Sequence, residues 1–160
     1  MHIKSPVISD IPRLVEIAIE TFGPFYEDYV RPQLGEKVFH HQHGNWREDY
    51  QDDIPTHHRP QEGRNIALAE LDDAIAGFIA WKIGEKPGHG EIYLLAVVPD
   101  QRRSHIGRQL CLHAFGSMKS AGVEVVEIGT GGDAFHAPAR ALYESLGFAK
   151  IPVVAYLKGI

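Results

Sequence analysis

The sequence contains a single cysteine, Cys111, so no disulfide can form within the chain. A lone thiol favours a reducing, cytoplasmic setting, because disulfides persist mainly in oxidising compartments. Segment 1–6 has no hydrophobic region of the signal-peptide type. No apolar run approaches the length of a membrane span, so the sequence predicts no membrane association.

Basic residues do not dominate the composition, since 16 Lys and Arg stand against 21 Asp and Glu, giving a net charge of −5. General nucleic-acid binding rests on many phosphate contacts, and an acidic chain argues against it. Of the 160 residues, 44% are hydrophobic and 23% are charged. One globular domain over residues 1–160, with a substantial core, is therefore expected.

Metal-ligand patterns are weak, although the chain has 10 histidines. His40, His41 and His43 lie close in sequence, as do His57 and His58. Adjacent residues point in different directions on a helix or a strand, and no cysteine joins these histidines. The sequence therefore predicts no metal site.

Hydrophobic periodicity predicts a mixed α/β fold. Strands are expected at 3–7, 66–71, 74–83, 91–98, 123–128 and 148–157, and helices at 11–22, 36–41, 46–52, 105–121 and 137–146. Gly23-Pro24 is expected to end the first helix, Asp72-Asp73 to form a hairpin turn, and residues 129–133 to form a flexible loop. This order predicts a mixed sheet covered by helices.

The most informative stretch runs from Glu91 to Met118. An apolar strand is followed by a short basic turn and then by a helix with apolar residues at Ile106, Leu110, Cys111, Ala114 and Met118. The first turn of a helix exposes unpaired N–H groups at the positive end of the macrodipole, which suits a phosphate. Gly107 is expected to let the backbone approach that ligand, and Arg102, Arg103 and Arg108 add positive charge.

Two segments carry a resemblance to a known family. Arg102-x-x-His105-x-Gly107, preceded by Leu95-Ala96-Val97-x-Pro99, resembles the pyrophosphate loop of the GNAT (GCN5-related) N-acetyltransferases. Ala139-x-x-Leu142-Tyr143-Glu144-x-Leu146-Gly147-Phe148 resembles the last characteristic segment of the same family. His105 stands where the loop usually has its first glycine, a position expected to need a free N–H more than a missing side chain.

The resemblance implies a single GNAT-like α/β domain whose mixed, mostly antiparallel sheet splays at the cofactor site, with helices on both faces. Acetyl-CoA is implied as co-substrate, with no metal. A β-bulge near Leu95–Val97 is expected to produce the splay, and the amide of Leu95 or Ala96 to polarise the thioester carbonyl. The residues implied in cofactor binding are Leu95, Ala96, Val97, Arg102, Arg103, Ser104, His105, Ile106, Gly107, Arg108, His136 and Tyr143.

Two of these assignments carry a second interpretation. Arg102 is expected to stabilise the turn more than to bind phosphate directly, because the family pattern depends on the amides that follow it. His136 stands where the family often has an asparagine that contacts CoA, so it is assigned either that contact or a helix cap.

The implied reaction moves an acetyl group to a primary amine, which must lose a proton before it attacks. Glu91 is the preferred base, because alternation places it on the same strand face as Tyr93. Tyr93 and His89 are the alternatives. By resemblance, Tyr143 protonates the departing thiolate, for which a phenol is a suitable acid.

Residues 23–60 have no family signature and are interpreted as a variable, helical acceptor-side region. Phe25, Tyr26, Tyr29 and Trp46 are assigned to substrate binding, and core or lid packing is the competing interpretation. The acceptor is a small-molecule amine, a protein N-terminus or a lysine side chain.

Two other functions are consistent with parts of the pattern. A CoA-binding sensor that has lost catalysis would keep the same loop. A P-loop nucleotide binder is disfavoured, because no Gly-Lys-Ser/Thr follows the turn. The sequence allows a homodimer without predicting one.

Overall fold

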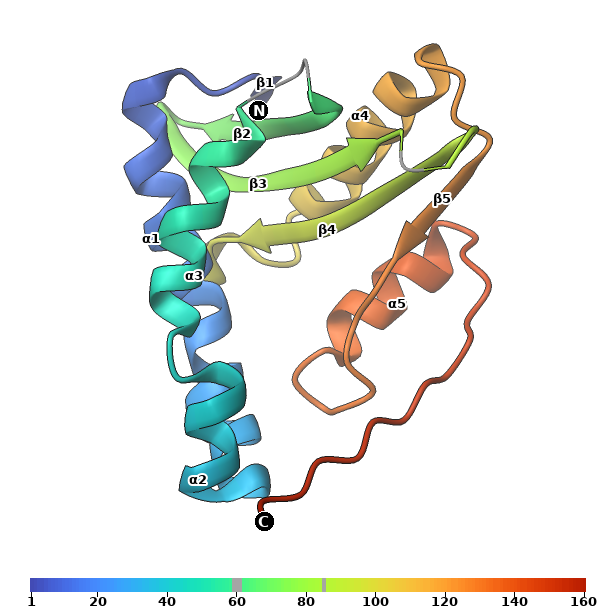
Figure 1. Cartoon of the computed structure of the whole chain (residues 1–160). Coiled ribbons are helices and arrows are strands. Elements are labelled where there is room, and N and C mark those ends of the chain that lie inside the picture. Colours follow the sequence, from blue (N-terminus) through green and yellow to red (C-terminus); the bar gives the residue numbers. More distant parts are fainter. Residues whose placement is uncertain (59–61, 85) are drawn as a thin grey trace.

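The computed structural model describes residues 1–58, 62–84 and 86–160, and its centre is a five-stranded sheet in the order β1-β2-β3-β4-β5 (Figure 1). The strands are β1 (His2–Lys4), β2 (Arg64–Leu71), β3 (Ala74–Ile83), β4 (His89–Val97) and β5 (Val125–Ile128). Every neighbouring pair is antiparallel except β4 with β5, which is parallel. The predicted mixed, mostly antiparallel sheet is therefore confirmed.

Helices cover both faces of this sheet, as predicted. They are α1 (Ile11–Pro24), α2 (Arg31–His43), α3 (Trp46–Asp53), α4 (Ile106–Ser120) and α5 (Ala137–Ser145), with a π-helical segment at Phe25–Val30 and short 3-10 segments at Ile8–Asp10, Ile54–His57 and Pro99–Gln101. Leu14 and Ile17 of α1 pack with Phe78 on one face. Leu110 and Cys111 of α4 pack on the other, where both are fully buried. Two apolar layers thus hold the sheet between helices.

The sheet opens between β4 and β5. Their parallel pairing ends where Ile92 meets Ile128, although β4 continues to Val97, and the two strands diverge from that point (Figure 1). A bulge also interrupts β4, because Ile92 pairs with Trp81 and Leu94 with Ala80, which leaves Tyr93 as the extra residue. The splay was predicted, but the bulge lies at Tyr93 and not near Leu95–Val97, where the pairing with β3 is regular.

The bulge changes which side chains face the helices. Tyr93 and the next residue, Leu94, both pack on the α1 face, whereas strict alternation would separate them. The extra residue therefore turns the Tyr93 side chain toward the helical region that precedes β2.

The prediction that Gly23-Pro24 ends the first helix is wrong. Pro24 keeps helical dihedrals (φ −58°, ψ −34°), and the chain passes through the π-helical segment directly into α2. A proline removes one backbone donor from a helix, and the wider π turn accommodates that loss without ending it. The real break comes at Gly35, with φ 71° and ψ 160°, so the predicted helix at 36–41 is the second half of α2.

The predicted last strand at 148–157 is also wrong, since residues 148–160 form no strand. The Phe148 amide instead donates to the Tyr143 carbonyl, which completes the end of α5. Ile151 and Tyr156 are 85% and 92% exposed, and the segment runs clear of the sheet (Figure 1). An apolar alternating pattern becomes a strand only beside a pairing partner, and Pro152 has no N–H to contribute.

Gly107 lies where a side chain would meet packed neighbours. A Cβ atom built there would lie 3.3 Å from Leu142 Cδ2, 3.8 Å from Val97 Cγ2 and 3.9 Å from Leu95 Cδ2. The missing side chain therefore lets the first turn of α4 pack closely against β4 and α5. Packing is thus a reason for this glycine that the sequence did not reveal, beside the predicted approach of a phosphate.

Gly107→Val is expected to lower the free energy of unfolding by about 1–3 kcal/mol, because the added methyl groups overpack the contact with Leu142. Gly116→Val is the matched control on the same helix, since a Cβ there meets nothing within 4 Å. The control should leave stability unchanged or slightly higher, because valine has the better helix propensity. Urea denaturation measures both variants, and equal effects would contradict the packing role.

Candidate active site

The loop between β4 and α4 presents backbone amides at the start of a helix. Arg103 and His105 both adopt left-handed conformations (φ 66° and 60°), and α4 begins at Ile106. Such a turn points successive N–H groups into a concavity, and the helix end adds a partial positive charge. Positive φ at His105 corrects the expectation for this position, because glycine is favoured there for its conformation as well as for its N–H.

The open end of the sheet forms a pocket. It lies between β4, α5 and the α1 end of the helical region. Its lining includes the predicted residues Phe25, Tyr26, Tyr93, Leu95, His136 and Tyr143, together with Phe22, Tyr50, Leu94, Ile128, Gly129, Thr130 and Ala139. Leu94 and Leu95 belong to the part of β4 that has already separated from β5. The pocket thus joins an unpaired strand edge to four tyrosines, Tyr26, Tyr50, Tyr93 and Tyr143.

Tyr143 comes to the pocket on α5, only 9% exposed. Burial raises the pKa of its phenol, and the nearby Cys111 thiol raises it further. The phenol therefore keeps its proton through the neutral range. Burial also raises the pKa of Cys111 to about 12, so that thiol is unreactive packing material.

His136 is held by its own loop. Its Nδ1 lies 2.8 Å from Asp133 Oδ2, and its amide donates to Asp133 Oδ1 at 3.1 Å. Burial opposes ionisation of Asp133, but the hydrogen bonds from His136 prevail and lower the carboxyl pKa. His136 is the N-cap residue of α5, and its carbonyl accepts from the Arg140 amide at 3.0 Å, but its side chain makes no capping hydrogen bond.

Hydrogen bonds from α5 hold the loop that carries His136, contrary to the expectation of a flexible segment at 129–133. Arg140 donates to the carbonyls of Gly131 and Asp133, each at 2.6 Å. The ring of His136 also packs edge-on against Phe25, with centroids 4.5 Å apart. These contacts connect α5 with the helical region across the pocket.

The four aromatics assigned to the substrate separate into two groups. Phe25 and Tyr26 line the pocket. Trp46 lies behind them, 2% exposed and stacked on Tyr26 with centroids 4.8 Å apart. Tyr29 sits farther out, 38% exposed and edge-on to Phe135. For Trp46 and Tyr29, the packing interpretation fits these positions better than direct contact with a pocket ligand.

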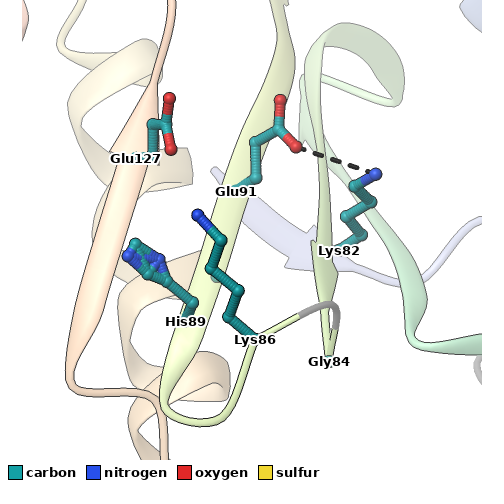
Figure 2. A pocket seen from close by; sticks show the side chains of 7 residues that line it. Lys82, Gly84, Lys86, His89, Glu91 and Glu127 are labelled. Carbon is teal, nitrogen blue, oxygen red and sulfur yellow. Dashed lines mark ion pairs between the residues drawn. The ribbon is translucent and has the colours of Figure 1, made fainter.

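Glu91 lies outside the aromatic pocket, in a separate shallow hollow. Figure 2 shows it on β4 beside Glu127 of β5, with Lys82, Lys86 and His89 around them. Glu91 Oε2 is 3.8 Å from Lys82 Nζ, and its backbone is in register with that of Glu127. Two of the three candidate bases, Glu91 and His89, therefore share this hollow, whereas Tyr93 shares the pocket with Tyr143.

Tyr93 has a partner that the sequence did not reveal. Its hydroxyl contacts Nδ1 of His57, and Nε2 of His57 lies 2.9 Å from Asp53 Oδ2. His57 is only 1% exposed. The one signal in the sequence was the Asp53–His57 spacing of four residues, which places two side chains on one helical face. Nothing in the sequence linked that pair to β4.

The part of the chain that the structure describes contains neither a metal-binding cluster nor a membrane-spanning helix. Among residues 1–58, 62–84 and 86–160, no group of three or more His, Cys, Asp or Glu side chains is arranged to hold a metal ion. In the same ranges, no helix has the length and apolar character needed to cross a membrane.

His105→Val is expected to be less stable than His105→Gly by about 1–2 kcal/mol, because a β-branched residue fits the left-handed conformation poorly and glycine fits it without cost. CoA titration calorimetry on both variants tests the loop as well. The glycine variant should keep the wild-type affinity. Equal stability of the two variants would show that this φ value is not maintained in solution.

Comparison with known proteins gives the chain its family. The family model described as Acetyltransferase (GNAT) family matches residues 15–148. A mycothiol acetyltransferase of Acidothermus cellulolyticus is 32% identical over 83% of this chain and 45% of its own length. One from Thermobispora bispora is 30% identical over 87% of this chain and 49% of its own length. The chain thus spans about half the length of these relatives.

Solved structures share the fold. The PaiA N-acetyltransferase of Thermoplasma acidophilum, in complex with coenzyme A, superposes with a TM-score of 0.75 at 23% identity, covering 92% of this chain and 89% of its own. An acetyltransferase of the GNAT family from Desulfovibrio desulfuricans gives 0.72 at 19% identity, covering 96% and 87%. With its splayed sheet, its helix-start loop and the family match over most of its length, the chain belongs to the GNAT acetyltransferase family.

Proposed function

We propose that the protein transfers the acetyl group of acetyl-CoA to a primary amine, by direct attack within a ternary complex. The observation that carries this proposal is the shared pocket, in which Leu94 and Leu95 of the unpaired β4 edge lie with Tyr93 and Tyr143. One ligand there can pair with the strand and reach an acid, while a second approaches from the aromatic side.

The donor fits the open edge and the helix start. The pyrophosphate binds the amides from Arg103 to Arg108, where the left-handed residues turn the N–H groups outward. The pantetheine arm carries amide groups, and it pairs with the β4 edge that β5 leaves free after Ile92. The amide of Leu95 or Ala96 then polarises the thioester carbonyl.

The chemistry needs a base for the ammonium and an acid for the thiolate. The ammonium loses one proton to the base, its neutral nitrogen attacks the carbonyl carbon, the C–N bond forms and the C–S bond breaks. The nitrogen then loses a second proton, which restores the phenol of the residue that protonates the thiolate. Tyr143 gives its proton to the leaving thiolate, and its raised pKa keeps that proton available. Glu91, Tyr93 and His89 remain the candidate bases, and only Tyr93 lines the pocket.

The pocket favours a small acceptor over a protein. Its aromatic walls, formed by Phe25, Tyr26 and Tyr50, enclose an apolar space beside Tyr93. Relatives at about 30% identity are named mycothiol acetyltransferases, so an amine related to mycothiol is the first acceptor to assay. A cationic small molecule also suits the net charge of −5.

A CoA-binding sensor of the same fold is the second candidate. It would use the loop and the β4 edge but would not need a buried phenol in the pocket. Release of free thiol from acetyl-CoA against a panel of amines separates the two candidates. Tight CoA binding without turnover on any amine would favour the sensor.

Tyr143→Phe is expected to lower kcat by about 100-fold or more while leaving the Kd for acetyl-CoA nearly unchanged, because only the acid proton is lost. Tyr156→Phe is the matched control, since Tyr156 is 92% exposed. The control should keep wild-type kcat. An equal loss of kcat and of affinity in Tyr143→Phe would remove the acid role.

A further inference from the structure

Three side chains in successive contact lead away from the pocket, starting at the Tyr93 hydroxyl. That hydroxyl contacts His57 Nδ1, and His57 Nε2 lies 2.9 Å from the Asp53 carboxylate. The three residues come from β4, the 3-10 segment Ile54–His57 and α3. Tyr93 reaches the pocket at one end, and Asp53, half-exposed, meets solvent at the other.

Two features of the fold bring these three side chains together. The β4 bulge makes Tyr93 the extra residue and turns its side chain to the α1 face. The helical spacing of Asp53 and His57 then fixes the imidazole, whose side chain is 0% exposed. A buried imidazole is costly unless both ring nitrogens have partners, and here both do.

Charge fixes the direction of the hydrogen bonds. The hydrogen bond from His57 lowers the pKa of Asp53 against the opposing effect of burial, and Arg64 lowers it further. Asp53 is therefore a carboxylate, which only accepts, so His57 carries its proton on Nε2. Nδ1 is then an acceptor, and the Tyr93 hydroxyl donates to it. Burial, followed by the Asp53 charge, raises the Tyr93 pKa, which keeps that phenol protonated.

The geometry points to Tyr93 as the catalytic base of the proposed acetyl transfer, with His57 and Asp53 as its positioning residues. The Tyr93 oxygen accepts a proton from the acceptor's ammonium while its own hydroxyl proton passes to His57 Nδ1. The amine becomes neutral, the imidazole becomes imidazolium, and the charge is balanced by Asp53. After the amide has formed, the imidazolium returns its proton to solvent through Tyr93, and the cycle closes with one proton released.

The groups that face this chain favour that transfer. Asp53 is the nearest charge and stabilises the imidazolium, while Arg64, 3.7 Å from Asp53 Oδ1, partly offsets it. On β4, Glu91 adds negative charge near Tyr93, and on α3 the neutral phenol of Tyr50 lines the same pocket. Tyr93 and His57 thus form an acid–base pair, and Asp53 is the third group that orients it.

Asp53→Asn tests the direction of the hydrogen bonds without changing side-chain size. Arg64 approaches Oδ1, so it should retain the amide oxygen there and leave the new NH2 group facing His57. Two donors cannot face each other, so the imidazole proton should move to Nδ1. Asp52→Asn is the matched control, because Asp52 is an exposed carboxylate on the same helix.

Nitrogen-15 NMR of the histidine rings in the free protein gives the first measurement. Wild type and Asp52→Asn should show His57 protonated on Nε2, and Asp53→Asn should show it on Nδ1. A wild-type His57 protonated on Nδ1 would overturn the inference. This measurement needs neither CoA nor an acceptor, so it is independent of the proposed function on which the catalytic role rests.

The second measurement is kcat against pH, with phenethylamine and its β,β-difluoro analogue as acceptors. Asp53→Asn and Tyr93→Phe should each lower kcat for phenethylamine by about 100-fold near neutral pH, with acetyl-CoA affinity within twofold of wild type. The loss should shrink for the fluorinated amine, which is already largely neutral and needs no base. A purely structural role would reduce both amines equally and would overturn the assignment.

Two further outcomes separate the competing explanations. If Glu91→Gln alters the pH profile and Asp53→Asn does not, the base is Glu91 and the inference fails. If the wild type acetylates neither amine nor any other in the panel, the proposed function fails and takes the catalytic role with it. In that case the NMR result still decides the hydrogen-bond direction on its own.

Discussion

The separation of β4 from β5 is the constraint on which the site depends. Pairing stops at Ile92 and Ile128, and the remaining half of β4 keeps only its β3 partner. A strand edge without a partner is normally a liability, because its N–H and C=O groups seek another chain. Here the free edge lines a pocket, and the chain continues from it into the loop in which Arg103 and His105 are left-handed before α4 begins. In the proposed function, the same break in the sheet provides both the place for the extended arm of the donor and the place for its phosphates.

Side chains pack on both faces of the sheet around the point where β4 separates from β5. On one face, α4 and α5 close on β4 through Gly107, where even one added carbon would lie 3.3 Å from Leu142. On the other face, the β4 bulge brings Tyr93 to the buried His57. Across the pocket, His136 holds its loop through Asp133 and packs against Phe25. Rigid elements thus position every polar group of the pocket that the proposed reaction uses.

The sequence predicted correctly the secondary-structure elements that depend mainly on residues close together in the chain. The β2–β3 hairpin, the α4 face with Cys111 at its centre and the helix at α5 follow from periodicity and turn residues, and all were confirmed. The helix through Pro24 was missed, because a π turn compensates for the proline in a way that no propensity shows. The strand at 148–157 was wrong because pairing needs a partner. The Tyr93–His57 contact spans 36 residues and depends on a one-residue bulge, so sequence spacing could not reveal it.

The most direct test of the central claim is amide hydrogen exchange, read by NMR, with and without saturating CoA. If the pantetheine arm pairs with the free β4 edge and the pyrophosphate binds the helix start, CoA should slow exchange in residues 94–97 and 103–108. The β1–β2 edge should not respond. Protection confined to another part of the chain, or no change with millimolar CoA, would contradict the account.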